Sequence, residues 1–189
     1  MLELNQTAHK ILDSAERFTQ LNGFNAFSYK DLQAQVGVKT SSIHYYFPTK
    51  HDLAQALIER YQASFEHTLI EIEQNRASSK EKLEALGQCY ISPLKDGRFC
   101  MCGMLASDMA GLPESVNSKV NAFFEYVETW IKRCLEQGVK SQELKSTLNI
   151  EQTAAQYLAL LEGGMLIART QKDPKHLEAL IKHLLAELG

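Results

Sequence analysis

Apolar residues recur every three or four positions along most of this chain, the spacing of a helix that buries one face. Near the N-terminus this pattern predicts a helix from about Asn5 to Leu21, and Gly23 is expected to end it in the left-handed conformation. The buried stripe of this first helix comprises Ala8, Ile11, Leu12, Ala15, Phe18 and Leu21. No segment shows the apolar–polar alternation of a half-buried strand. The pattern predicts an all-α fold of about nine helices.

Two short helices and a tight turn are predicted between residues 28 and 48. Ser28 with Asp31 forms a capping box that opens the first of them, and Gly37 can end it at low steric cost. Thr40–Tyr46 form the second, which Pro48 cannot continue. A helix, a glycine-containing turn and a second helix predict a helix-turn-helix motif, whose second helix enters the DNA major groove.

A long helix follows this motif. Thr49 with Asp52 forms a second capping box, and the apolar stripe continues to about Gln74 without a glycine or proline. Such a helix would join the first three helices rigidly to the rest of the chain. We therefore predict a helix-turn-helix domain in residues 1–48 and a second helical domain in residues 49–189.

Caps and apolar stripes predict the remaining helices in the same way. They cover residues 78–93, 100–106, 113–138, 149–168 and 173–188. Gly163 and Gly164 lie near the centre of one of them, where each glycine costs about 1 kcal/mol relative to alanine. Close approach of another helix would explain that cost. With the leucine-rich last helix, this predicts a homodimer whose interface is a four-helix bundle of the last two helices of each chain.

Several positions of the helix-turn-helix segment have a distinctive spacing: Gly37, Val38, Ser42, Ile43, Tyr46, Phe47, Pro48, Lys50 and Leu53. They resemble the DNA-binding signature of the TetR/AcrR family of transcriptional regulators. The resemblance implies a tetracycline-repressor-like dimer that binds a palindromic operator through one recognition helix in each of two major grooves. It also implies a C-terminal domain in which a small-molecule effector causes release from DNA.

Polar side chains that packing does not require are the candidates for DNA contact. On the second helix of the motif they offer hydroxyl and ring groups to bases and phosphates, and Lys50 can neutralise a phosphate beside free backbone N–H groups. The resemblance carries contact roles onto Thr40, Ser41, His44, Tyr45, Tyr46 and Lys50. The full predicted DNA-binding set is Ser28, Lys39, Thr40, Ser41, Ser42, His44, Tyr45, Tyr46 and Lys50.

The motif departs from the family pattern at two places. Lys39 stands where a serine able to cap the recognition helix is common, so another group has to cap it. His44-Tyr45 reverses the commoner order of tyrosine and histidine. Both rings suit phosphate contact, and which of them reaches base edges stays open.

Charge does not favour non-specific binding to nucleic acid. The whole chain has a net charge of −3, and residues 1–60 contain six basic and six acidic side chains. A protein that coats DNA regardless of sequence carries a basic surface. We therefore expect selective recognition through a few placed contacts.

An effector pocket is predicted from apolar and polarisable residues expected to converge in the second domain, because methionine and aromatic side chains suit a plastic apolar cavity. Glu162 could select a cationic or hydroxylated ligand there, or could equally be exposed beside Gly163. The predicted set is Phe65, Leu69, Met101, Cys102, Met104, Leu105, Phe124, Tyr157, Glu162 and Met165.

Cysteine chemistry supplies an alternative. Cys100 and Cys102 have no second Cys/His pair at ligand spacing, so we expect neither a metal nor a cofactor. One of these thiols could instead sense oxidants or electrophiles if its pKa were depressed. The same residues could also simply pack the centre of the domain.

Other classes of protein fit less well. No catalytic Ser/His/Asp set, carboxylate pair or phosphate-binding glycine loop suggests an enzyme. A DNA-binding protein without an effector is a further alternative. The most apolar run, 153–168, is too short to span a membrane, and no signal peptide precedes the first helix. We therefore expect a cytoplasmic protein with reduced thiols.

Overall fold

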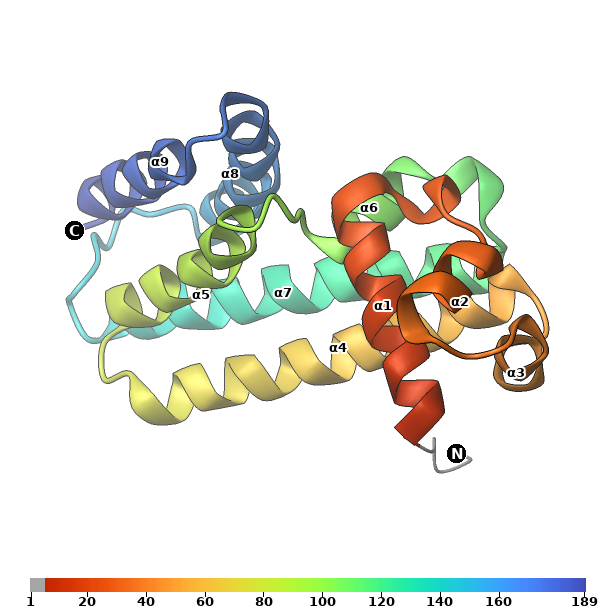
Figure 1. Ribbon diagram of the computed structural model, residues 1–189. Helices are drawn as coiled ribbons and strands as arrows, with labels where there is room; N and C mark the ends of the chain where they lie inside the picture. The colour runs from red at the N-terminus through yellow and green to blue at the C-terminus, as the bar shows by residue number, and fades with distance from the viewer. Residues whose placement is uncertain (1–5) are drawn as a thin grey trace. The chain divides into compact units, whose positions relative to one another are not determined.

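The computed structural model describes residues 6–189, which form nine α-helices and two short 3-10 helices without a strand (Figure 1). The predicted all-α class is confirmed. Asn5, the expected start of the first helix, lies outside the described residues. In chain order the elements are α1 (Gln6–Asn22), η1 (Phe24–Ala26), α2 (Tyr29–Val36), α3 (Thr40–Tyr46), α4 (Lys50–Asn75), α5 (Ser79–Leu94), α6 (Met101–Ser107), η2 (Met109–Gly111), α7 (Glu114–Lys140), α8 (Ile150–Gln171) and α9 (Pro174–Glu187).

The helices form two compact units. The N-terminal unit contains the described residues up to Ala63 together with Met101–Asn121, and the C-terminal unit contains Ser64–Cys100 and Ala122–Gly189. Helices α4 and α7 therefore contribute residues to both units. The functional boundary between residues 48 and 49 stays a prediction, because compact packing does not define which residues bind DNA or an effector.

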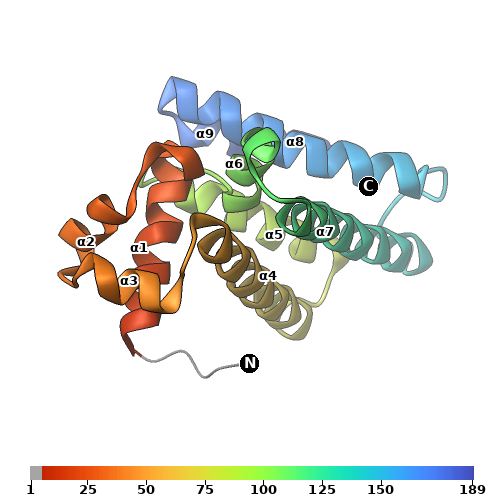
Figure 2. The same ribbon diagram turned by 90° about the vertical axis from the view of Figure 1, so that its right-hand side faces the viewer.

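Helices α1, α2 and α3 pack on one another in the N-terminal unit (Figure 2). The predicted stripe of α1 is buried at Ile11 and Leu12. Arg60 of α4 joins α4 to α1, since its guanidinium donates at 2.6 Å to a carboxylate oxygen of Asp13 and at 2.6 Å to one of Glu16. These bonds hold α1 against the N-terminal half of α4.

The turn after α1 differs from the prediction. Gly23 has φ 98° and ψ 153°, so its φ is positive but its conformation is not the left-handed helical one. The reason lies in η1, which begins at the next residue. Asp108, from the segment between α6 and η2, accepts hydrogen bonds from the backbone N–H groups of Phe24 (3.0 Å) and Asn25 (3.2 Å). A side chain from the second half of the chain thus caps η1.

The C-terminal unit is organised around the pair α8 and α9, which pack on each other and on α5 (Figure 1). A Cβ atom on Gly164 would lie 2.7 Å from Cδ1 of Leu177 in α9. The predicted close approach of a helix is therefore found at Gly164, within the same chain. Gly163 faces open space, with no atom within 4 Å of its Cβ position. The homodimer stays a prediction.

Several predicted helix ends in the C-terminal part of the chain were too early. Pro93 lies inside α5, which continues to Leu94, α7 continues past Gly138 to Lys140, and α8 continues past residue 168 to Gln171. Gly138 is needed for packing there, since its Cβ position lies 2.6 Å from the side chain of Leu144. None of the helices in residues 6–189 combines the length and the apolar character of a membrane span.

Candidate functional site

The turn between α2 and α3 has the conformation that the sequence predicts. Gly37 has φ 77° and ψ 21°, in the left-handed region, and its N–H donates to the Gln33 carbonyl at 2.9 Å. Ile43 and Phe47 are buried and attach the inner face of α3 to the unit. The opposite face of this short helix is consequently presented to solvent on a fixed frame.

That outer face carries the side chains proposed to contact DNA. Ser41 and His44 are exposed, and Tyr45 is 80% exposed although its ring is large and largely apolar. Thr40, Ser42 and Tyr46 are half-buried beside them, and the Tyr46 ring meets the Tyr45 ring edge-on at 5.0 Å. An exposed aromatic ring on a rigid helix is a typical recognition element. The sequence grouped these residues correctly on one helix, and their DNA contacts stay predictions.

Caps and local bonds determine which groups on this face are available. Lys39 occupies the N-cap of α3 and makes no capping bond with its side chain, and the Thr40 hydroxyl donates to the side chain of Gln33. The Ser28 hydroxyl donates to the Asp31 carboxylate at 2.7 Å at the start of α2. The main role of Ser28 is therefore that of a helix cap. Its hydroxyl oxygen can still accept a hydrogen bond.

The imidazole of His44 is oriented by the backbone. Its Nδ1 lies 3.1 Å from the Pro48 carbonyl oxygen. A carbonyl only accepts, so Nδ1 carries the hydrogen and the neutral ring leaves Nε2 as an acceptor. In that state Nε2 suits a donor such as a base amino group, whereas contact with a phosphate requires the protonated ring.

Tyr29 is a supporting residue that the sequence did not single out. Its hydroxyl lies 2.8 Å from the Phe47 carbonyl oxygen and 2.7 Å from that of Thr49, on the two sides of Pro48. Its ring also meets the His44 ring edge-on at 4.7 Å. Burial, together with the charge of Asp52, raises the pKa of Tyr29 to about 12. The hydroxyl is thus retained as a donor that fixes the connection from α3 to α4.

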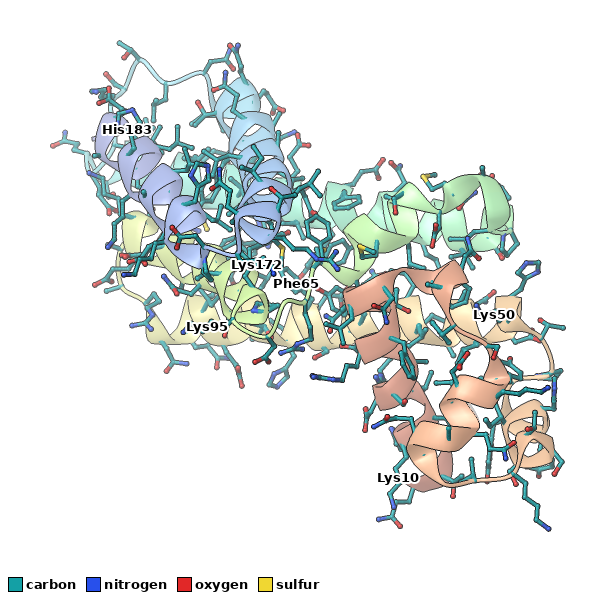
Figure 3. The ribbon with its side chains drawn as sticks, turned by 45° about the horizontal axis from the view of Figure 1, so that its top comes forward. Lys10, Lys50, Phe65, Lys95, Lys172 and His183 are labelled. Atoms are coloured by element: carbon teal, nitrogen blue, oxygen red, sulfur yellow. The ribbon has the colours of Figure 1, made fainter. Side chains whose placement is uncertain are left out.

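Lys50 lies in the first turn of α4 (Figure 3) and its ammonium group is already engaged. Nζ donates to the Phe24 carbonyl at 2.6 Å and lies 4.7 and 4.3 Å from the ring centres of Phe24 and Phe27. Burial lowers the pKa of Lys50, and the charges of Asp108 and Asp31 oppose that shift. An ammonium group has three donors, so the predicted phosphate contact would have to use those that η1 leaves available.

The replacement Lys50→Ala is expected to lower the free energy of unfolding by about 1–2 kcal/mol, because it removes a charged hydrogen bond and contacts over two rings. It should also weaken binding to every DNA sequence and reduce the salt dependence by about one unit. Lys39→Ala is the matched control, expected to change the salt dependence by a similar amount at unchanged stability. Urea unfolding and DNA titrations at several salt concentrations measure both effects. If Lys50→Ala left the salt dependence of DNA binding unchanged, Lys50 would make no phosphate contact, and its role would be the structural contact with η1.

The predicted effector residues divide between the two units. Met101, Cys102, Met104 and Leu105 lie on α6 in the N-terminal unit. The other members belong to the C-terminal unit, namely Phe65, Leu69, Phe124, Tyr157, Glu162 and Met165. Figure 3 labels Phe65. Their assignment to one effector site stays a prediction.

Within the C-terminal unit, aromatic rings gather around Phe65. Its ring centre lies 5.2 Å from that of Phe123 and 6.3 Å from that of Tyr90, both edge-on, and Phe124 packs on Phe123 at 5.5 Å. The hydroxyl of Tyr157 donates to the Leu83 carbonyl at 2.7 Å, and burial raises its pKa strongly. Tyr157 thus has a structural bond that joins α8 to α5.

Glu162 is not the exposed residue that the sequence left possible. Both carboxyl oxygens are buried, and no hydrogen bond of ordinary geometry reaches them. The polar group beside them is the thiol of Cys100, a weak donor. Burial first, and then Cys100, raise the pKa of Glu162 well above its ordinary value. Burial therefore favours the neutral, protonated form of this side chain.

No disulfide links the four cysteines, all of which lie within the described residues. Burial raises the pKa of Cys89, and it raises the pKa of Cys134 to about 12, so neither thiol is activated. No group of three or more His, Cys, Asp or Glu side chains in residues 6–189 is arranged to hold a metal ion.

Comparison with known proteins agrees with this geometry. Residues 11–57 match the family described as bacterial regulatory proteins, tetR family, and residues 79–184 match the tetracyclin repressor-like C-terminal domain. The chain belongs to the tetR family. Members of this family are transcriptional regulators and generally DNA-binding repressors that respond to ligands. The match over residues 11–57 includes the whole of α2 and α3.

Solved structures of other tetR-family regulators share the fold. A regulator from Legionella pneumophila is 32% identical, with both chains fully covered and a TM-score of 0.88. One from Agrobacterium tumefaciens is also 32% identical, over 96% of this chain and 97% of its own, with a TM-score of 0.91. The reduced form of NemR from Escherichia coli, 22% identical over 95% of each chain, has a TM-score of 0.83 and supports the fold alone.

Proposed function

We propose that this protein is a cytoplasmic transcriptional repressor that binds a palindromic operator as a dimer and is released by a small-molecule effector. The observation that carries the DNA-binding part is the exposed outer face of α3, with Ser41, His44 and Tyr45 on a frame fixed by Ile43 and Phe47. Each subunit would place this face in one major groove, so that the two-fold symmetry of the dimer selects an inverted repeat.

The even balance of basic and acidic residues in the N-terminal region supports selective recognition. Phosphate contacts supply affinity without sequence information, whereas side chains at base edges supply specificity. Helix α3 itself contains no lysine, and its exposed side chains are Ser41, His44 and Tyr45. Specificity should consequently depend strongly on a few side chains of α3.

Selection of tightly bound sequences from random duplex DNA by the purified protein is expected to return an inverted repeat. Tyr45→Ala should change the preferred base in each half-site, with a loss of about 1–3 kcal/mol of discrimination at that position. Tyr126→Ala, which alters a tyrosine of the C-terminal unit, should return the wild-type sequence. Recovery of the same operator at the same affinity by the Tyr45→Ala protein would show that α3 does not read it.

Release by an effector is supported by the connectivity of the helices. Residues of α4 and of α7 belong to both units, so each helix provides a continuous backbone route along which a shift can pass. An effector shifts the equilibrium between DNA-binding and released states only by its differential affinity for them. The aromatic cluster around Phe65 and the buried acid Glu162 are the groups we propose for such differential contacts.

The thiol-sensor alternative has less support. A reactive cysteine needs a stabilised thiolate, usually beside a cation or a helix N-terminus. Cys100 is buried, and burial among apolar side chains disfavours the charged thiolate. Cys102 is fully buried on α6. Effector binding therefore explains these residues better than oxidation does.

A further inference from the structure

Glu162 is an acidic residue in an apolar part of α8. The side chains one helical turn away, Leu158 and Met165, are buried and apolar, and Leu161 beside it is completely buried. The Glu162 carboxyl oxygens lie inside this layer without a hydrogen-bond donor of ordinary geometry. Within residues 6–189, the titratable group that acts on it is the thiol of Cys100, in the connection after α5.

Such a group normally has a reason to be retained. A buried polar group without a partner costs about 1–3 kcal/mol, and in native proteins almost every such group is paired. A leucine or methionine would fill the same helix position without that cost. Folding of the subunit alone therefore does not explain Glu162, whereas a donor that arrives with a bound molecule does.

We propose that Glu162 is the polar anchor of the effector site, and that the effector class carries a hydrogen-bond donor, preferentially a protonated amine, on an apolar body. This proposal rests on the effector response proposed above and specifies its chemistry. The apolar body would contact side chains such as Met165 and Phe65. The donor would give the carboxyl group a strong hydrogen bond, where the structure offers only the weak thiol donor of Cys100.

The charge of the ligand follows from the surroundings of the acid. An ammonium group brings a positive charge and N–H donors, so it can bind the carboxylate as a charge-assisted pair once the acid has released its proton to solvent. A hydroxyl can donate to the neutral acid but gains no charge interaction. A carboxylate would place a second acid beside Glu162 without a cation to balance it. The expected order of affinity is ammonium, then alcohol, then carboxylate.

Three probes of equal length test this order: octylammonium, octanol and octanoate. Trp130 is the only tryptophan of the chain and is buried in the C-terminal unit, so its fluorescence reports binding there. We expect octylammonium to bind the full-length protein at least about tenfold more tightly than octanoate. In Glu162→Gln, which keeps the shape and removes the ionisable group, the two probes should differ by less than about twofold.

Equal affinities for octanoate and octylammonium in the wild-type protein, or no binding of any of the three probes, would overturn the proposal. Thermal unfolding gives an independent check: Glu162→Leu should melt at a higher temperature than wild type, because it removes an unpaired buried acid. A lower melting temperature would assign Glu162 to folding, against the proposal. The increase in melting temperature caused by Glu162→Leu should be larger at pH 8 than at pH 5. The folded wild type binds the Glu162 proton more tightly than the unfolded chain does, so the wild type loses stability as the pH rises, whereas the variant has no such proton to lose.

Gel-shift titrations separate this proposal from the proposed function. Wild type and Glu162→Gln should bind the selected operator equally well without a probe, and octylammonium should release only the wild type. Operator binding by both proteins, with no preference for the ammonium probe, refutes the donor chemistry alone. Absence of operator binding by the wild type refutes the repressor function itself.

Discussion

Replacement of Ile167 by glutamate is expected to convert the protein from dimer to monomer and to weaken operator binding at least about hundredfold. Leu166 and Ile167 on α8 are 55% and 46% exposed, and Gly163 lies on the same face one turn earlier with open space above it. Two adjacent exposed aliphatic side chains beside a glycine form a surface suited to a second copy of the helix. A charge at its centre would be buried unpaired in the dimer. Without the dimer each half-site is bound separately and loses the gain from linkage.

Ile70→Glu provides the matched control, since Ile70 is 48% exposed and lies on α4. The same change of charge there should leave the dimer and the operator affinity intact. Sedimentation equilibrium and a gel-shift titration measure the two quantities. A dimeric Ile167→Glu protein, or a monomeric wild type, would show that the interface lies elsewhere.

The two neighbouring glycines of α8 are expected to respond in opposite directions to the same substitution. Gly164→Ala should destabilise the fold by about 1–3 kcal/mol, because the new Cβ would lie 2.7 Å from Cδ1 of Leu177, and this fully buried side chain would have to shift. Gly163→Ala meets no atom and should stabilise the helix by up to about 1 kcal/mol.

Both alanine variants are best compared in the Ile167→Glu background, where the predicted interface no longer contributes to stability. Urea unfolding followed by circular dichroism gives the two free energies. Destabilisation of similar size by both substitutions would mean that Gly163 also packs against a helix within the subunit. The two alanine variants can also be compared with the native Ile167 present. Loss of self-association in Gly163→Ala but not in Gly164→Ala would then place Gly163 at the interface.

Local signals in the sequence predicted much of the fold. Gly37 needed a positive φ between two helices, and Thr49 with Asp52 formed a complete capping box within four residues. The capping rules apply to such features because the interacting groups lie one turn apart. The all-α class, the helix-turn-helix and the outer face of α3 followed from them.

Features that depend on distant residues were missed or misassigned. The conformation of Gly23 depends on η1, which Asp108 caps from 84 residues away. The engagement of Lys50 with Phe24 and the burial of the Glu162 oxygens also depend on chain segments far apart in sequence. A single sequence gives periodicity and caps but no long-range pairing. These contacts could therefore be found only in three dimensions.

The bond from Asp108 to η1 has a consequence for how the DNA-reading part can be exchanged between proteins. The compact N-terminal unit includes Met101–Asn121 as well as the first helices, so it is not formed by one continuous segment of the chain. A chimaera that joins residues 1–63 to a foreign C-terminal domain would leave the N–H groups of Phe24 and Asn25 without their acceptor. A transplant that keeps specificity has to include α6 and Asp108, the residue after it, together with the first helices, as two separate segments of one chain.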